Sequence, residues 1–266
     1  MEEAARAPGG DGDTSPLTAC ILVHSPIVGP DSWWPVADEL ERRGIQAVVP
    51  DLIDDGTPPF WRQHVRSAVQ AIAQDIAPGV SLVLVAHSGA GQLLGVLGPV
   101  LSDAGYRVAC YVLADAALPP PNISRLEQLE IDWPAVAAEL HELFEQGETF
   151  PNWTDEMLRP LVPHDERRAR LIDGIRRQPH SFWSEPIPTA LHWPDAPVGV
   201  LLFSDAYRPT AVMAAQQQWP LADMEAGNHF VGLVDESAVT DHLLDLIAIL
   251  IPSDALGGDV GRLSGR

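Results

Sequence analysis

The stretch SLVLVAHSGAGQLLG, residues 81–95, joins a run of apolar residues to a serine and a series of small residues. The first part predicts a buried β-strand, and the part after Ser88 predicts a helix. The serine therefore stands at a strand-to-helix turn, and the Gly-Ala-Gly that follows it is small enough for a sharp turn with a helix packed close behind. The N–H of Gly89 and the start of the helix favour negative charge near the hydroxyl. Ser88 is thus a candidate nucleophile, although a serine that only caps a helix is the common alternative.

Short apolar runs and amphipathic stretches alternate along most of the chain. The apolar runs predict strands at 18–24, 45–52, 81–87, 107–115, 198–204 and 219–225, and the amphipathic stretches predict helices at 32–44, 59–77, 89–104, 209–217 and 236–251. Strands that are apolar along their whole length are typical of a sheet that is buried on both faces. The sequence therefore predicts an α/β fold with a doubly wound, mostly parallel sheet.

One segment, residues 118–195, breaks this alternation. It is rich in proline, carries four tryptophans and has mostly helical patches such as AVAAELHELFEQG. We interpret it as a mainly helical cap, inserted after the strand that ends near Asp115, that lines a pocket over the edge of the sheet. The predicted core then consists of residues 17–117 and 196–252, and disordered tails are expected at 1–16 and 253–266.

The composition limits the classes of partner. The chain has 266 residues, of which 46% are hydrophobic, and this is enough for one large domain with a sizeable core. Its net charge of −21 argues against nucleic acid and anionic membrane surfaces as partners. There is also no run of about 18 apolar residues that would predict a membrane span. No spacing of histidines, cysteines and carboxylates is typical of a metal site, no cofactor is expected, and the oligomeric state cannot be read from the sequence.

Two further features bear on the compartment. The N-terminal stretch MEEAARAPGGDGDTSP lacks the apolar segment of a signal peptide. Cys20 and Cys110 lie in the apolar runs TACILV and VACYVL, where buried free thiols are expected rather than a disulfide. Together these features predict a cytoplasmic protein.

A serine nucleophile needs a general base, and the histidines supply three candidates. His229 lies in the motif GNHF, in a loop directly before the last predicted helix, where it can face the carboxyl ends of the strands. His24 ends the first predicted strand, and His87 stands beside Ser88. We expect His229 to be the base and the other two histidines to shape the pocket.

Several stretches together resemble the α/β-hydrolase fold family over roughly residues 18–252. They are LVHSPIVGPDSWWPVADELERRG, VVPDL, VAHSGAG, VLADAALP and a GNHF that precedes a helix, and the order Ser…Asp…His matches as well. The resemblance is to the small capped group that contains plant-type esterases and hydroxynitrile lyases. It implies a triad with Ser88 as nucleophile, His229 as base and an aspartate that orients the base.

Two aspartates compete for the role of the triad acid. Asp205 follows the strand after the cap, where the family usually places its acid, but the acid often stands two residues further on, where this chain has Tyr207. Asp115 follows the strand after the serine, where the haloalkane-dehalogenase branch carries its acid. The sequence leaves both aspartates open.

The resemblance also exposes a defect in the expected oxyanion hole. One donor should be the N–H of Gly89, and the family's second donor is the N–H two residues after the histidine of the LVHG-like stretch. Here that stretch reads His24-Ser25-Pro26, and proline has no N–H. Either Ser25 or Ile27 donates instead, or the protein does not run ordinary ester hydrolysis.

The function predicted from these residues is hydrolysis of an ester or thioester of a hydrophobic small molecule. We expect the substrate to contact His24, Ile27, His87, Trp133 and Phe230. One alternative is a lyase, cyclase or isomerase on the same fold that uses Ser88 and His229 as acid and base. Another is a catalytically silent protein that binds a small molecule in the same pocket.

Overall fold

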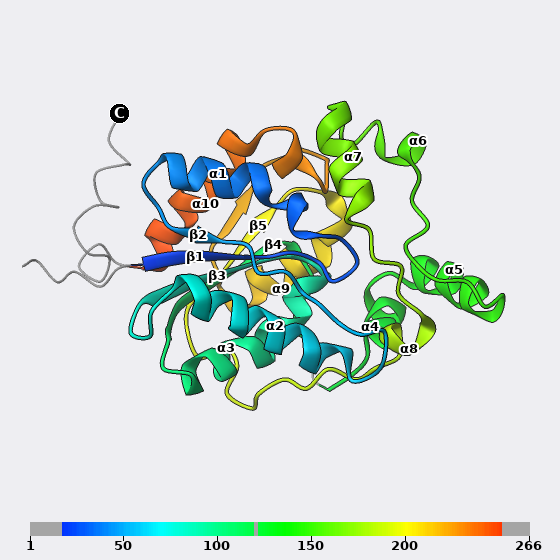
Figure 1. Ribbon diagram of the computed structural model, residues 1–266, viewed down its shortest axis with the longest axis horizontal. Helices are drawn as coiled ribbons and strands as arrows, with labels where there is room; N and C mark the ends of the chain where they lie inside the picture. The colour runs from blue at the N-terminus through cyan, green and yellow to red at the C-terminus, as the bar shows by residue number, and fades with distance from the viewer. Residues whose placement is uncertain (1–17, 120–121, 252–266) are drawn as a thin grey trace, which may run out of the picture.

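A parallel β-sheet forms the centre of the structure, a computed structural model that describes residues 18–119 and 122–251 (Figure 1). Within these ranges the sheet has six strands in the order β2-β1-β3-β4-β5-β6, and every neighbouring pair is parallel. The strands are β1 (Thr18–Val23), β2 (Ala47–Val48), β3 (Ser81–Ser88), β4 (Arg107–Ala116), β5 (Val198–Leu202) and β6 (Leu221–Asp223). The predicted parallel α/β sheet is confirmed.

The strand that carries the serine lies in the middle of the sheet. β3 pairs with β1 on one side, where Val23 is opposite Ala86, and with β4 on the other, where Ser88 is opposite Ala116. Because parallel strands end at the same edge, this register places Ser88 between the carboxyl ends of its two neighbours. The first seven residues of β3 are buried, in agreement with its unbroken apolar run.

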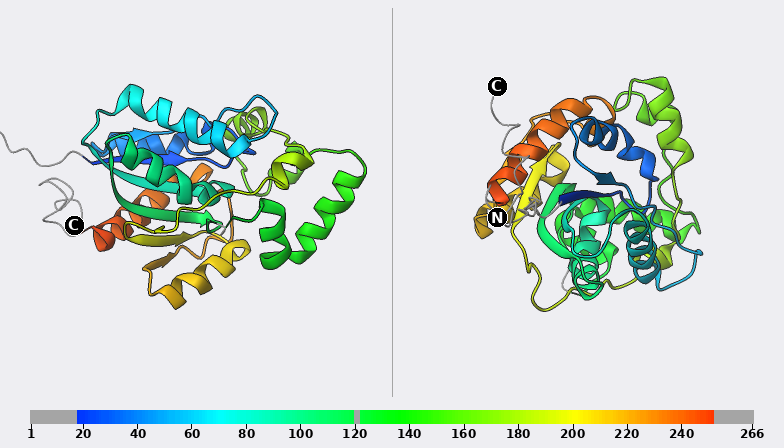
Figure 2. Two further views of the ribbon diagram at one scale, coloured as in Figure 1. Left: turned by 90° about the horizontal axis from the view of Figure 1, so that it is seen from below. Right: turned by 60° about the vertical axis from the view of Figure 1, so that its left-hand side comes forward.

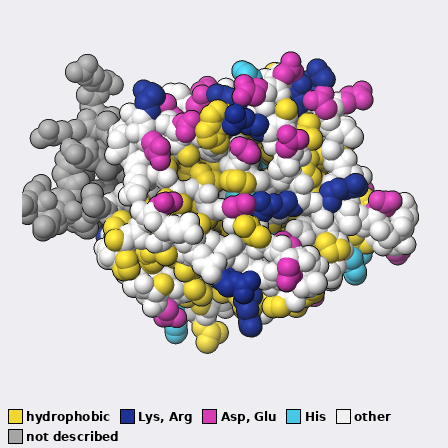
Figure 3. All heavy atoms as spheres, in the orientation of Figure 1, with side chains coloured by type: hydrophobic (Ala, Val, Ile, Leu, Met, Phe, Trp, Pro, Cys, Tyr) yellow, Lys and Arg dark blue, Asp and Glu magenta, His cyan; other side chains and the backbone are white. Residues whose placement is uncertain are grey.

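Helices cover both faces of the sheet (Figure 1; Figure 2, left). One face packs against α1 (Trp34–Arg42) and α10 (Glu236–Leu250). The other packs against α2 (Phe60–Asp75), α3 (Leu94–Asp103) and α9 (Arg208–Gln217). Each interface is a cluster of buried, mostly aliphatic side chains, and burial of this kind contributes about 1.5–3 kcal/mol per large side chain. On the face shown in Figure 3, acidic and basic side chains are interspersed between apolar ones.

Three predicted elements differ clearly from those observed, and one of them, the strand predicted at 219–225, is reduced to Leu221–Asp223. The strand predicted at 45–52 is reduced to Ala47–Val48, since Pro50 has no N–H to continue a ladder. The helix predicted at 89–104 begins as the 3₁₀ turn η2 (Gly89–Leu93) before α3. Cys20 and Cys110 are buried free thiols, as predicted. The predicted tails, 1–16 and 253–266, lie outside the described residues.

The segment between β4 and β5, called the insert below, lies beyond the carboxyl ends of the strands (Figure 1). Its described part contains α4 (Arg125–Asp132), α5 (Pro134–Glu145), α6 (Asp155–Leu158), α7 (Asp165–Asp173) and α8 (His180–Trp183). A third apolar cluster joins insert residues such as Leu140 and Phe182 to Ile27 and Phe230 of the core. No helix in the described part of the chain is long and apolar enough to cross a membrane.

Candidate active site

Ser88 occupies a strained turn between β3 and η2. Its backbone has φ 58° and ψ −130°, a region that L-residues avoid, and such strain is characteristic of functional turns. The turn depends on Gly91, because a Cβ at this position would lie 1.9 Å from the carbonyl oxygen of Ala117. The end of β4 is held against the turn by a hydrogen bond of 3.1 Å from the Ala117 N–H to the Ser88 carbonyl. The glycine at position 91 is therefore required by the close approach of the residue that follows β4.

His229 lies in the loop between β6 and α10, and its ring is held by a buried carboxylate. Nδ1 is 2.7 Å from Oδ2 of Asp115, so Nδ1–H donates to the carboxylate and leaves Nε2 available to accept a proton. Asp115 is completely buried at the end of β4. Of the two aspartates left open by the sequence, Asp115 is therefore the one that contacts His229.

Asp115 is kept ionised by the donors around it. Its Oδ1 accepts the backbone N–H groups of Phe203 and Ser204 at 2.9 Å each, and its Oδ2 accepts the Ser204 hydroxyl at 2.6 Å. Burial opposes ionisation, but the hydrogen bond from His229 and those from the end of β5 outweigh it and hold the pKa of Asp115 below its ordinary value. The two residues that follow β5 thus donate hydrogen bonds to Asp115 and contribute no carboxylate to His229.

The structure does not bring Asp205, the other candidate acid, to His229. The Asp205 side chain is 88% exposed and is paired with Arg208 of α9. The strand β5 ends three residues earlier, at Leu202, and the chain turns outward through the 3₁₀ turn η3 (Asp205–Tyr207). The carboxylate therefore points into solvent.

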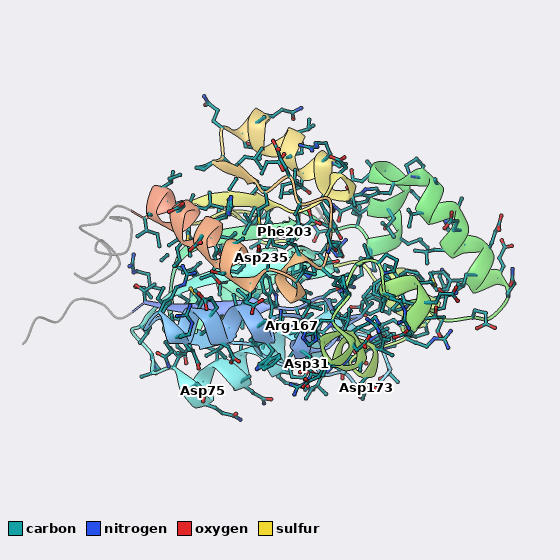
Figure 4. The ribbon with its side chains drawn as sticks, turned by 90° about the horizontal axis from the view of Figure 1, so that it is seen from above. Asp31, Asp75, Arg167, Asp173, Phe203 and Asp235 are labelled. Atoms are coloured by element: carbon teal, nitrogen blue, oxygen red, sulfur yellow. The ribbon has the colours of Figure 1, made fainter. Side chains whose placement is uncertain are left out.

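The loop of His229 is anchored to the insert. Asn228 donates from Nδ2 to the Leu161 carbonyl at 2.7 Å. Arg167 of α7, labelled in Figure 4 near the start of α10, donates to the Leu233 carbonyl at 3.0 Å and to Oε2 of Glu236 at 2.7 Å. These contacts fix the base relative to the wall of the pocket.

His87 packs against the ring of His229 and does not line the pocket above Ser88. Its Nε2–H donates to the His229 carbonyl at 3.0 Å, and the two imidazoles stack with centroids 4.3 Å apart. Burial, together with the charge of His229, lowers the pKa of His87 to about 3, so the ring is neutral. The expectation that His87 contacts substrate is corrected, because the side chain is buried beneath the base.

His24 is likewise a support for the loop and not a pocket residue. It is completely buried, its Nδ1–H donates to the Ser25 carbonyl at 2.8 Å, and its Nε2 accepts the Leu52 N–H at 3.2 Å. The Nε2 atom also lies 3.5 Å from Oδ1 of Asp51. The predicted substrate contact of His24 is therefore corrected to a role in holding the loop that begins at Ser25.

The residues predicted to form the oxyanion hole lie together in the structure, but one of the two expected backbone donors is missing. Ser25, Pro26, Ile27 and Gly89 all line the pocket beside Ser88. A Cβ on Gly89 would lie 3.3 Å from the Ser25 hydroxyl, so this hydroxyl is next to the Gly89 backbone. Pro26 stands at the second-donor position without an N–H.

Tyr207, which the sequence indicates only as the residue at the usual position of the acid, lies against both Ser88 and His229. Its Oη lies 3.0 Å from the Ser88 Oγ, and its ring stacks on His229 with centroids 5.2 Å apart and planes inclined by 14°. Within the described residues, the Ser88 hydroxyl bonds to Tyr207 and not to His229. The family position predicts a carboxylate there, and no sequence pattern indicates that a phenol at this position contacts Ser88.

The pocket above Ser88 has a volume of about 400 Å³, within the range of small-molecule sites. Of the residues expected to contact substrate, Ile27, Trp133 and Phe230 lie in its wall. The insert supplies most of the remaining apolar lining, which includes Leu129, Val136, Leu140, Phe150, Trp153, Met157, Leu158, Leu161, Phe182 and Trp183. The pocket is therefore shaped for an apolar ligand whose polar end reaches Ser88.

One charged side chain also borders this pocket. Arg125 of α4 is 2% exposed, and its guanidinium carbon lies 4.0 Å from the centre of the Phe182 ring. Burial lowers the pKa of Arg125 to about 10. As for metals, residues 18–119 and 122–251 contain no group of three or more histidines, cysteines and carboxylates that could hold one.

Comparison with known proteins establishes the family and the fold of this chain. The model of the alpha/beta hydrolase family matches residues 20–241, and the chain belongs to this family. Esterase PIR7B of rice (Oryza sativa subsp. japonica) is 31% identical over 106 residues, which are 37% of this chain and 38% of the relative. The match thus spans well under two thirds of that relative's length.

Solved structures of low sequence identity share the fold. An extracellular α/β-hydrolase from a Paenibacillus species superposes with a TM-score of 0.67 at 17% identity, and the match covers 89% of this chain and all of the other. Tomato methylketone synthase I has a TM-score of 0.66 at 14% identity, with 88% of this chain and 98% of the other covered. At these identities the similarity establishes the α/β-hydrolase fold alone.

Proposed function

We propose that this protein is a serine esterase that hydrolyses an ester or thioester of a hydrophobic small molecule through Ser88, His229 and Asp115. The observation that carries the proposal is the hydrogen bond from His229 to the buried Asp115 beside a serine on a strained turn. The rice relative is named an esterase, which supports the same class of reaction.

The proposed reaction has two steps. In the first, Ser88 Oγ attacks the carbonyl carbon while its proton passes to His229 Nε2. The Gly89 N–H stabilises the oxyanion, and the carboxylate of Asp115 stabilises the imidazolium. The proton then goes to the departing alcohol or thiol, which leaves an acyl-serine. In the second step, His229 takes a proton from a water molecule as the water oxygen attacks the acyl carbon. The bond from that carbon to Ser88 Oγ then breaks, Oγ takes the proton back from His229, and the acid product leaves.

The ligand class follows from the wall of the pocket. Aromatic and aliphatic side chains from the insert dominate the lining, and polar groups gather around Ser88. Removal of apolar surface from water contributes about 25 cal/mol per Å², so affinity is expected to rise with the apolar area of the acyl or alkyl group. A cavity of about 400 Å³ limits this group to small-molecule size.

A fluorophosphonate probe with intact-mass detection tests the nucleophile. Wild type is expected to gain one adduct, which Ser88→Ala abolishes and His229→Ala slows strongly. His141→Ala is the matched control, since His141 is half exposed on α5 and pairs with Glu130. A panel of p-nitrophenyl esters of increasing chain length then tests the substrate class. A folded wild type that takes no label and hydrolyses no ester of the panel would exclude the proposal.

A second candidate function is proton-transfer chemistry without an acyl-enzyme, and Pro26 is the observation that favours it. An incomplete oxyanion hole weakens acyl transfer more than it weakens acid–base catalysis at a bound ligand. One solved structure of similar fold is that of a methylketone synthase. The fold therefore also occurs in proteins that are not named esterases. Conversion of a ligand by a protein that takes no fluorophosphonate label would support this alternative.

A further inference from the structure

The missing N–H at Pro26 leaves a specific chemical gap. A tetrahedral intermediate on Ser88 places a negative oxygen beside the serine, and of the two backbone donors that the family resemblance implies, only the Gly89 N–H is present. Loss of one donor to such an oxygen typically lowers the rate by about 10²–10³-fold. An efficient enzyme with this turn therefore needs a donor from another part of the chain.

Tyr207 is the side chain placed to fill this gap. Its hydroxyl is 3.0 Å from Ser88 Oγ, the atom that forms the new bond. The oxyanion develops on the carbon that Oγ attacks, so it is separated from Oγ by only two bonds. A phenol that reaches Oγ in the resting protein needs only a small tilt to reach that oxygen.

The position of Tyr207 is fixed from two sides. Its ring stacks on His229, and the Trp133 ring meets it edge-on with centroids 5.4 Å apart. Trp133 Nε1 donates to the Ala206 carbonyl at 2.6 Å, which holds the turn η3 next to α5 of the insert. Such prior fixation lets a donor stabilise charge without reorganising during the reaction.

The protonation state of the phenol suits a donor. Burial raises the pKa of Tyr207, and the charge of Asp115 acts in the same direction, against a smaller opposing effect of the Ser88 hydroxyl. The hydroxyl therefore keeps its proton at neutral pH. The hydroxyl of Ser25 is the competing donor, since it also lies near Gly89.

We propose that Tyr207 is a further catalytic residue, whose hydroxyl bonds to Ser88 in the resting enzyme and donates to the oxyanion in place of the N–H that Pro26 lacks. When Ser88 gives its proton to His229 and Oγ bonds to carbon, the hydrogen bond of Tyr207 Oη shifts to the carbonyl oxygen, which carries the electron pair of the former C=O π bond. The pair returns as the leaving group departs, so Tyr207 neither gains nor loses a proton. This inference rests on the proposed esterase function.

The test is Tyr207→Phe, which keeps the ring against His229 and removes only the hydroxyl. We expect kcat on an activated ester to fall by about 10²–10³-fold with little change in KM. Tyr106→Phe is the control, because Tyr106 is buried and bonds to the Ile76 carbonyl away from the pocket. Ser25→Ala, measured alongside, is expected to lower kcat less than Tyr207→Phe.

Two further measurements separate donation from a structural role. A boronic acid forms a tetrahedral adduct with a serine hydroxyl, and Tyr207→Phe is expected to weaken its binding in parallel with kcat/KM. Pro26→Ala returns an N–H to the turn and is expected to recover part of the activity lost in Tyr207→Phe.

The outcomes distinguish this inference from the function on which it rests. An unlabelled, inactive wild type contradicts the esterase function, and the inference falls with it. A labelled, active wild type with unchanged or faster turnover in Tyr207→Phe overturns the inference alone. The inference is also overturned if Tyr207→Phe loses turnover but binds the boronate as wild type does and is not rescued by Pro26→Ala. A greater loss of kcat in Ser25→Ala than in Tyr207→Phe overturns it as well.

Discussion

The neutral histidine behind the base makes the stability of the protein depend on pH in a way that can be calculated. His87 has a folded-state pKa of about 3, whereas an unfolded chain takes up a proton on histidine near pH 6.5. Between these values the unfolded state binds more protons than the folded state. Stability is therefore expected to fall as the pH decreases through 6.5.

The magnitude follows from the two pKa values. At pH 5 the unfolded histidine is almost fully protonated and the folded one is not, so His87 lowers the unfolding free energy by about 2 kcal/mol relative to pH 7.5. Any folded-state pKa below about 4.5 gives nearly the same loss at pH 5. The prediction therefore depends on the burial of the ring more than on the exact position of the shift.

The matched variant is His87→Gln, which can keep a donor to the His229 carbonyl but does not titrate. Urea unfolding of both proteins at pH 7.5, 6.5, 5.5 and 5.0 gives the two pH profiles. Other titrating groups are present in both proteins and largely cancel in the difference. Wild type is expected to lose about 2 kcal/mol more than the variant between pH 7.5 and 5. Equal losses in the two proteins would refute the argument that a neutral His87 is enforced by the fold.

Three other substitutions test the site and its frame. Asp115→Asn is expected to lower kcat on an activated ester by about 10⁴-fold, because the amide no longer stabilises the imidazolium. Asp205→Asn is expected to leave kcat unchanged. Comparable losses of kcat in the two variants would contradict the assignment of Asp115 as the acid. Gly91→Ala is expected to reduce both the unfolding free energy and kcat, since its methyl meets the Ala117 carbonyl at 1.9 Å, and a fully active variant would argue against the close approach. Gly98→Ala places a methyl 2.0 Å from the hydroxyl of the buried Tyr111. It is expected to lower the unfolding free energy, measured in urea, by about 1–3 kcal/mol and to leave kcat unchanged. An unchanged unfolding free energy would contradict this expectation.

The strands of the core could be predicted because each signal is local. A strand that is buried on both faces needs an unbroken apolar run, and β3, β4 and β5 each have one. The extent of β2 could not be predicted in the same way, since its run of apolar residues continues to Val49. Strand length there depends on where the partner β1 offers hydrogen bonds and on Pro50, which ends the ladder.

In the candidate site, too, only the features with a local sequence pattern could be predicted. Ser88 and His229 could be identified because a strained turn and a pre-helix loop leave local marks in the sequence. The choice between Asp115 and Asp205 could not be made, because it depends on which of two strand ends reaches the loop of His229. The contact between Tyr207 and Ser88 joins residues 119 positions apart and leaves no local pattern.

This chain departs from the family pattern at Asp115, Tyr207 and Pro26, and in the proposed site these three departures depend on one another. With the acid at the end of β4, position 207 after β5 no longer has to hold a carboxylate against His229. A phenol fits there, because its ring can stack on the imidazole while its hydroxyl reaches the serine. Once a hydroxyl is supplied from this side, the N–H that Pro26 lacks is no longer indispensable. The relocated acid, the tyrosine and the proline therefore form one coupled arrangement, and returning an N–H at position 26 should matter most when the tyrosine hydroxyl is absent.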